Sequence, residues 1–184
     1  MTIYFYGEKD LYGEFSNFHP SEFQVCARDI FSDKERIESE LLDKKVTVYT
    51  SEQAIMWMKG VLMNDSQTAL QIENAKSPKE CRRLGRKVTP FDDDKWKLWR
   101  EEIAVYVLTK KFTSSAHLFS VLESTKGQDI AEASRNDRIW GIGIDKTNAL
   151  EGMKWRGENI LGKSLMTVRD NMENGTLTIL SGCW

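Results

Sequence analysis

Glu52 and Lys59 are the pair of residues whose types and spacing most directly suggest chemistry. They are seven positions apart, so a helix over 51–62 places them on one face about two turns apart. A carboxylate and an amine that line one cleft can exchange protons with a substrate or attack it as a nucleophile. The alternative is a solvated first-turn glutamate and an exposed lysine, and spacing alone favours that alternative.

Arginine and tryptophan side chains supply candidate contacts for a phosphate and a flat base. Arg82, Arg83 and Arg86 share one helical face, and guanidinium forks suit phosphate oxygens. The alternative is a solvated basic face. Trp96, within reach of Trp99 on the next helix turn, would stack on a base if its ring is exposed. The alternative is a core position, because a tryptophan on an apolar stripe is more often buried.

A second carboxylate, Asp137, precedes a glycine-bearing aromatic turn over 140–143. The glycines let the backbone approach a ligand closely, and Asn136 and Trp140 belong to the same segment. In the alternative, Asp137 only caps the backbone of its own turn. Asn159 opens the last predicted helix, whose N-terminus attracts anions such as phosphate, although a simple capping asparagine is the favoured alternative.

Helices dominate the elements that must position these residues. Thr50 or Ser51 can cap the first helix, and Asp92 to Asp94 begin the longest. The predicted helices cover about 51–62, 66–74, 77–86, 94–112, 115–124 and 159–172; the predicted strands cover 2–6 and 46–50, with a strand or turn over 135–145. No alternating βαβ pattern is visible, which argues against a doubly wound fold. The sequence therefore predicts a helix-rich α+β single domain with a small β-sheet.

The predicted domain spans residues 1–175 and is followed by a C-terminal tail over 176–184. It carries a charged insertion at about 30–46. Within residues 32–45, Ile37, Leu41 and Leu42 stand near helical spacing, which is typical of a short surface helix or a mobile excursion. The tail ends in apolar residues that favour a strand.

Charge and cysteine usage narrow the classes of function. The formal net charge is −2, so the chain lacks a global basic field for gripping a nucleic-acid backbone. Cys26, Cys81 and Cys183 are far apart and have no metal-ligand spacing, so we expect neither a metal site nor a disulfide framework. The segment GIGID over 141–145 is too short for a dinucleotide fingerprint, and we expect no cofactor.

The N-terminal residues lack the features of a signal peptide. No apolar run approaches the roughly 18–20 residues that span a bilayer. We therefore expect a soluble, cytoplasmic protein with reduced cysteines and no membrane partner. The sequence makes no prediction of the oligomeric state.

Seven motifs in order carry a resemblance to a known family. They are FSNF (15–18), TSEQ (50–53) with Lys59, SP…RRLGR (77–86), a tryptophan in the long helix, KF (111–112), NDRIWGIG (136–143) and GENILGKSLMTVR (157–169). Together they resemble the NADAR superfamily and its YbiA-like members, over nearly the whole chain. The resemblance implies a YbiA-like fold and an enzyme that hydrolyses an N-glycosidic bond between ribose and a base.

The resemblance also assigns residues. Glu52, Asp137 and Lys59 are the implied catalytic groups. The implied substrate-binding residues are Trp96, Arg83, Trp140, Asn136, Asn159 and Asn17. The implied substrate is a small ribosylated base, such as the riboflavin-pathway intermediate 5-amino-6-ribosylaminouracil phosphate. One alternative is removal of ADP-ribose from guanine, where a nucleic acid would enter as the modified substrate. A second alternative is a non-catalytic module that binds ADP-ribose or NAD.

Overall fold

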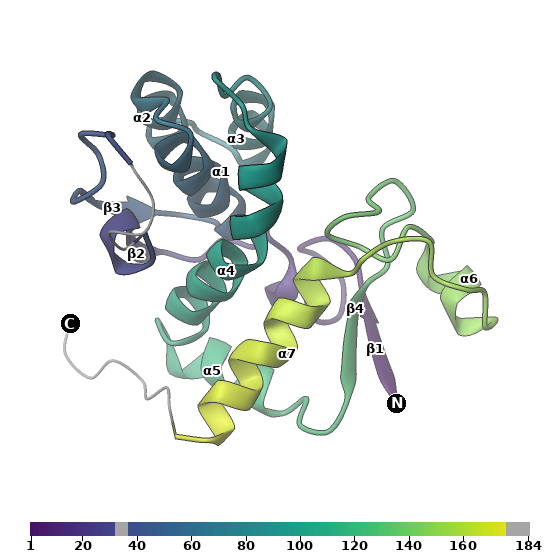
Figure 1. Ribbon diagram of the computed structural model, residues 1–184. Helices are drawn as coiled ribbons and strands as arrows, with labels where there is room; N and C mark the ends of the chain where they lie inside the picture. The colour runs from purple at the N-terminus through teal and green to yellow at the C-terminus, as the bar shows by residue number, and fades with distance from the viewer. Residues whose placement is uncertain (32–36, 176–184) are drawn as a thin grey trace. The chain divides into compact units, whose positions relative to one another are not determined.

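The chain forms two compact units in the computed structural model, which describes residues 1–31 and 37–175. The central unit comprises Pro20–Lys110. The terminal unit combines Met1–His19 with the described residues from Lys111 to Gly175, so it is built from two segments far apart in the sequence. Figure 1 labels the helices and strands. None of the helices in the described ranges has the length and apolar character needed to cross a membrane.

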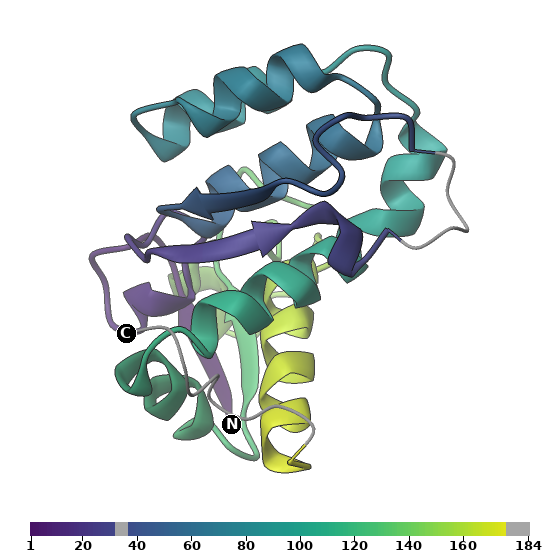
Figure 2. The ribbon, with the colours of Figure 1, turned by 90° about the vertical axis from the view of Figure 1, so that its left-hand side faces the viewer.

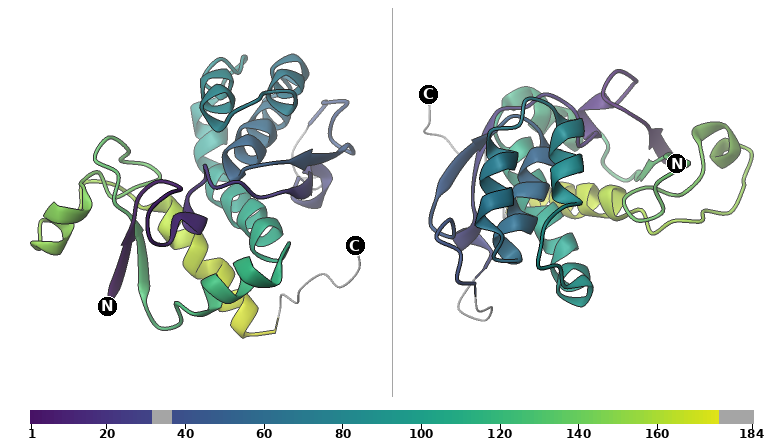
Figure 3. Two further views of the ribbon diagram at one scale, coloured as in Figure 1. Left: turned by 180° about the vertical axis from the view of Figure 1, so that it is seen from behind. Right: turned by 90° about the horizontal axis from the view of Figure 1, so that it is seen from above.

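The central unit pairs a short antiparallel sheet with three packed helices. Strands β2 (Phe23–Cys26) and β3 (Lys45–Val48) run side by side, with Phe23 opposite Val48 and Cys26 opposite Lys45 (Figure 2). A 3-10 turn, η2 (Ala27–Asp29), follows β2. Helices α1 (Ser51–Leu62), α2 (Ser66–Glu73) and α3 (Pro78–Gly85) pack against one another, as the view from above in Figure 3 shows.

Helix α1 is the core of the central unit, because nearly all of its residues are buried. Two glycines allow its neighbours to approach closely. A Cβ at Gly60 would lie only 2.9 Å from the Cβ of Ala69 in α2, and a Cβ at Gly85 in α3 would collide with the side chain of Met56. Helix α4 (Asp93–Phe112) begins in the central unit, and its last two residues belong to the terminal unit.

The terminal unit is built on a parallel strand pair. Strands β1 (Thr2–Phe5) and β4 (Asp129–Glu132) align Thr2 with Asp129 and Phe5 with Glu132. Helix α7 (Ile160–Glu173) packs against β4, and α5 (Ala116–Glu123) packs against α7 (Figure 1). The unit also contains the 3-10 turn η1 (Gly13–Phe15) and the short helix α6 (Lys146–Leu150).

The predicted helix-rich α+β class is confirmed, and the six predicted helices match α1 to α5 and α7 to within one or two residues. Several details differ. Residues 135–145 form turns without a strand, and the strands β2 and β4 and the helix α6 were not predicted. Residues 37–44 are not helical, and Leu41 and Leu42 are buried. The predicted strand in the tail and residues 32–36 of the insertion lie outside the described residues.

Candidate active site

Hydrogen bonds fix the first turn of α1, where the candidate carboxylate stands. Thr50 caps the helix by accepting a hydrogen bond from the backbone N–H of Gln53 at 3.1 Å. The side-chain amide of Gln53 donates to the carbonyl oxygens of Ile72 and Glu73, both at 3.1 Å. Gln53 thus joins the start of α1 to the end of α2, and the backbone of the neighbouring Glu52 is held in place.

Glu52 is buried, with 4% of its surface exposed, and its carboxylate meets a guanidinium from α3. Arg82 Nε lies 3.1 Å from Glu52 Oε1, and Arg82 Nη2 lies 3.3 Å from Glu52 Oε2. This bidentate fork favours the ionised carboxylate, which burial alone would disfavour. The solvated first-turn glutamate that spacing favoured is therefore wrong. The negative charge also acts on Cys81: burial first, then Glu52 and Glu80, raise the pKa of its thiol to about 12.

Lys59 lies two turns further along α1 and also faces α3. Its Nζ donates a hydrogen bond to the carbonyl oxygen of Gly85 at 2.8 Å. The ammonium also lies 4.4 Å from the ring centroid of Phe91 and 5.4 Å from that of Trp96. Burial lowers the pKa of Lys59 below its ordinary value of 10.5, which enlarges the fraction of neutral amine. The predicted common face of Glu52 and Lys59 is confirmed, because both side chains contact α3.

The two tryptophans at the start of α4 have different surroundings. Trp99 is buried and packs edge-on against Phe31, with ring centroids 5.3 Å apart. Trp96 is only half-buried and contacts the ammonium of Lys59. Trp99 is therefore a core residue, whereas Trp96 keeps part of its ring available for stacking.

The arginines of α3 also differ from one another. Arg82, whose side chain is 41% exposed, is the one that reaches Glu52. Arg83, the arginine predicted to bind substrate, is exposed and lies 3.8 Å from Glu80 in the same helix. Arg86 is exposed at the end of the helix.

Helical phase is the signal that distinguishes Arg82. Cys81, Leu84 and Gly85 form the buried side of α3. With a step of about 100° per residue, Arg82 lies nearer to the centre of that side than Arg83 does. The sequence therefore held enough information to select Arg82 as the arginine that flanks the packed face.

In the terminal unit, Asp137 shapes the turn that follows it. Asp137 Oδ1 accepts hydrogen bonds from the backbone N–H groups of Ile139 at 3.0 Å and Trp140 at 2.8 Å. This is the self-capping geometry that was the alternative for this residue. Asp137 is only half-buried, however, and its second oxygen receives no hydrogen bond from the described residues. The turn therefore orients the carboxylate and leaves its second oxygen available to bind a ligand.

The same turn is hydrogen-bonded to the start of α7. Three backbone N–H groups at the helix start donate to three carbonyl oxygens of the turn, in the pairs Asn159 to Gly141, Ile160 to Ile139 and Leu161 to Trp140. Asn159 is buried; its Oδ1 accepts from Glu132 N at 3.1 Å, and its Nδ2 donates to Ile130 O at 2.9 Å. The side chain does not cap the helix. Asn159 instead joins α7 to β4. The backbone N–H groups of residues 159–161 are already bonded to carbonyl oxygens of the turn.

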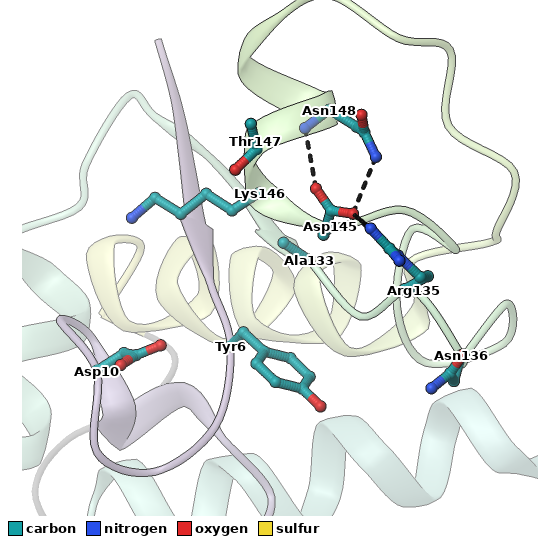
Figure 4. A pocket seen from close by; sticks show the side chains of 9 residues that line it. All are labelled: Tyr6, Asp10, Ala133, Arg135, Asn136, Asp145, Lys146, Thr147 and Asn148. Atoms are coloured by element: carbon teal, nitrogen blue, oxygen red, sulfur yellow. Dashed lines mark hydrogen bonds and ion pairs between the residues drawn. The ribbon is translucent and has the colours of Figure 1, made fainter.

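Asn136 lines a polar pocket of about 570 Å³ in the terminal unit (Figure 4). The other lining residues are Tyr6, Asp10, Ala133, Arg135, Asp145, Lys146, Thr147 and Asn148. Asp145 is engaged on two sides, because it accepts hydrogen bonds from the Nε of Arg135 and the backbone N–H of Asn148, both at 3.0 Å. The pocket wall is thus held together by its own ion pair.

Two buried polar atoms near the motifs receive no hydrogen bond from the described residues. One is Oδ1 of Asn17, a residue that is 6% exposed, and the other is the hydroxyl of Ser51 beside Glu52. Buried polar groups are normally satisfied, so each marks a place where a ligand or a water molecule would complete the bonding. A sequence cannot reveal this property, because it depends on what surrounds the atom.

The structure divides the predicted site residues between the two units. The central unit contains Glu52, Lys59, Arg83 and Trp96; the terminal unit contains Asn17, Asn136, Asp137, Trp140 and Asn159. Lys59 contacts Trp96, and Asp137 bonds to Trp140. Within residues 1–31 and 37–175, no three histidine, cysteine or acidic side chains gather as a metal site would require.

A buried carboxylate in a guanidinium fork, with a half-buried lysine on the same helix, defines a chain equipped for acid–base chemistry. The model of the NADAR domain family matches residues 4–173, which include parts of both units. The chain belongs to the NADAR family, and the predicted resemblance is confirmed.

Relatives with names and a solved structure support this membership. The chain is 32% identical to protein irg-1 of Caenorhabditis elegans over 86% of this chain and 74% of that protein. It is 31% identical to N-glycosidase Npun_R5314 of Nostoc punctiforme, over 95% and 94%. It is 29% identical, over 92% of its length, to 25% of the chloroplastic riboflavin biosynthesis protein PYRR of Zea mays. The NMR structure of the E. coli protein YbiA matches all of this chain and 89% of that one, with a TM-score of 0.70 and 25% identity.

Proposed function

We propose that this chain is an N-glycosyl hydrolase that cleaves the bond between C1 of a ribose and a nitrogen of a base. The observation that carries the proposal is Glu52, a buried carboxylate held by Arg82 at the start of the helix that also bears Lys59. The name N-glycosidase of the Nostoc relative supports the reaction class.

Glu52 has the properties needed for the charge that develops in this reaction. Cleavage builds positive charge at C1, and a nearby carboxylate stabilises that charge. Because the fork of Arg82 favours the ionised form, we assign Glu52 to stabilising the cation and activating water. The leaving nitrogen takes a proton from a general acid, and Asp137 is the second catalytic carboxylate that the resemblance implies. The water oxygen then bonds to C1, and its proton leaves with the general base.

Lys59 offers a second route through the same groups. An N-ribosylamine can open to an imine, and a neutral amine can attack the C1 of that imine. Burial lowers the pKa of Lys59, which makes the neutral amine more available. The C1–N bond to the base then breaks as a proton passes to the departing nitrogen, which leaves the sugar as an imine on Lys59. Water hydrolyses that imine, releases the sugar and restores the free amine.

The remaining predicted residues are assigned to binding. Trp96 stacks on the base, because its ring is half-exposed. Arg83 is exposed and suits a phosphate. The resemblance also assigns Asn136 and Trp140 to substrate binding. Asn159 acts indirectly, by fixing α7 against β4.

Two substrate classes fit this bond chemistry. The first is the riboflavin-pathway intermediate 5-amino-6-ribosylaminouracil phosphate, which the name of the maize relative supports. The second is guanine that carries ADP-ribose, in a nucleotide or in DNA, which the exposed arginines of α3 favour. The net charge of −2 weighs against a substrate that contacts the protein through many phosphates of a nucleic acid. It does not weigh against binding of a mononucleotide.

A hydrolysis panel read by mass spectrometry tests the proposal. It contains the ribosylaminouracil phosphate, ADP-ribosyl-guanosine and a guanine oligonucleotide carrying ADP-ribose. Each is incubated with the wild type, with Glu52→Gln, and with Glu101→Gln as a matched control at an exposed site of α4. We expect one substrate to be cleaved by the wild type and the control, and cleaved about 10²- to 10⁴-fold more slowly by Glu52→Gln.

Each outcome has a distinct meaning. Release of ribose 5-phosphate from the first substrate assigns the metabolic role, and release of ADP-ribose from a guanine substrate assigns the repair role. Full activity in Glu52→Gln would overturn the role of that carboxylate. Folded wild-type protein that cleaves none of the three, yet binds ADP-ribose or NAD in a calorimeter, would replace the enzyme with a binding module.

A further inference from the structure

A fully buried lysine outside the assigned catalytic groups holds the turn that precedes Asn17. Lys111 is 0% exposed, and its Nζ donates hydrogen bonds to the carbonyl oxygens of Glu14 at 2.6 Å and Ser16 at 3.0 Å. The ammonium also lies 5.2 Å from the ring centroid of Phe112. Burying a cation costs free energy unless polar groups compensate it, and the two carbonyl oxygens supply that compensation here.

The turn held by Lys111 is otherwise fixed by aromatic packing. The ring of Phe15 is buried, stacks on Tyr12 at 5.3 Å and meets Phe5 edge-on at 5.6 Å. Ser16 donates from its N–H to Gly13 O at 3.0 Å, and its own carbonyl oxygen is one of the two that Lys111 binds. Lys111 thus binds the backbone on both sides of Phe15, at Glu14 and at Ser16, and Ser16 directly precedes Asn17.

Asn17 is the residue that this arrangement places. Its Oδ1 is buried and receives no hydrogen bond from the described residues. Leaving a buried amide oxygen without a hydrogen bond costs free energy. A partner from outside the chain would recover that cost, and an amide oxygen binds the O–H or N–H donors that a ribose or a base edge provides.

We propose that Lys111 is a positioning residue of the substrate site, which holds the turn from Glu14 to Ser16 so that the Asn17 amide accepts a hydrogen bond from the ribosylated base. The inference rests on the proposed function and extends it. Lys111 contacts no reacting atom in this scheme. Its effect reaches the substrate through the backbone and Asn17.

The protonation state of Lys111 makes the hold sensitive to pH. Burial lowers the pKa of Lys111 to about 7, and the carboxylate of Glu14 opposes part of that shift. Two histidines belong to the same group: His117 lies 3.5 Å from Glu14, and His19 interacts with both Lys111 and Glu14, and more weakly with Glu8. An ammonium binds carbonyl oxygens more strongly than a neutral amine does, so the hold weakens as the pH rises through about 7.

Nuclear magnetic resonance on labelled protein tests the proposal without requiring turnover. The side-chain amide signal of Asn17 is assigned by its loss in Asn17→Ala. The wild type, Lys111→Met and the exposed-site control Lys163→Met are each titrated with ribose 5-phosphate and with ADP-ribose. We expect at least one ligand to shift the Asn17 signal in the wild type and the control, and about tenfold weaker binding in Lys111→Met.

A double-mutant cycle separates positioning from a general structural role. If Lys111 acts through Asn17, Asn17→Ala and the double variant lose affinity by the same factor. In the wild type, affinity for ADP-ribose should fall between pH 6 and pH 8.5. In Lys111→Met the part of the fall above pH 6.5 should be absent, because the pKa of His19 is lowered from 6.5. ADP-ribose suits this pH series because its diphosphate does not change protonation state in that range.

Several results would overturn the proposal. Asn17→Ala binding as tightly as the wild type would mean that only water completes the amide. Folded Lys111→Met with wild-type affinity and the wild-type pH profile would remove the positioning role, and so would two losses that simply add. No shift of the Asn17 signal with either ligand would do the same. These outcomes are independent of the hydrolysis panel, whose failure would leave the binding measurements in place.

Discussion

Arg82 and Glu52 form a two-point contact between α3 and α1, with N–O distances of 3.1 and 3.3 Å. The pair joins a buried carboxylate to a guanidinium whose side chain is 41% exposed. Arg82 can therefore hold Glu52 while remaining in contact with solvent and with a ligand. This contact fixes the orientation of Glu52 more firmly than its place in the first turn of α1 alone would.

Removing that contact should reduce catalysis more than removing the neighbouring arginine. We expect Arg82→Gln to lower kcat/KM by about 10- to 100-fold, the effect of losing a hydrogen-bonded charge partner. Arg83→Gln makes the same chemical change one position along and should act mainly on KM, because Arg83 does not hold Glu52. Steady-state kinetics on the substrate found in the panel check this. Equal effects of the two variants on kcat would contradict the role of Arg82.

Lys59 should be trapped by reduction if the imine route operates. Sodium borohydride added during turnover would reduce a sugar–lysine imine to a stable amine, and peptide mass spectrometry would locate it. Because burial lowers the pKa of Lys59, trapping should be more efficient at Lys59 than at an exposed lysine at the same pH. The exposed Lys79 of α3 serves as the internal control. Adducts spread equally over both lysines would argue against a specific role for Lys59.

Local signals in the sequence sufficed for the helices and for part of the site. The caps at Thr50 and Ser77 and the proline at position 78 are read directly from residue types, and the helices begin there. The shared face of Glu52 and Lys59 follows from helical spacing. The burial of this face does not follow from helical spacing, because it depends on α3 packing against α1.

Features that depend on distant partners could not be predicted. Strand β4 has four residues and pairs in parallel with β1, more than 120 positions earlier in the chain. The functions of Asn159 and Lys111 likewise lie in contacts with residues remote in sequence. From the sequence, Asn159 was expected to cap a helix, and Lys111 was singled out only as part of the KF motif over 111–112.

The buried ammonium of Lys111 should make stability depend on pH in a defined direction. Its pKa is about 7 in the folded chain and near 10.5 when unfolded, so between these values the unfolded chain binds more protons. The free energy of unfolding of the wild type, relative to Lys111→Met, should therefore rise from pH 7 to pH 10.5, by at most about 4 kcal/mol. Urea titrations across this range measure the difference. A flat or falling difference would show that Lys111 keeps its proton when buried.

The junction of α7 with β4 should tolerate almost no added volume at Gly162. A Cβ there would collide with the carbonyl oxygen of Ile130 and with the side-chain amide of Asn159, which bond to each other. We expect Gly162→Ala to lower the free energy of unfolding by about 1–3 kcal/mol through overpacking. Asn159→Asp should cost a similar amount, because an oxygen replaces the Nδ2 donor that faces the Ile130 carbonyl. The two losses should not add in the double variant, since both act on one contact. Strict additivity in urea titrations would mean that Asn159 and Gly162 stabilise the start of α7 independently.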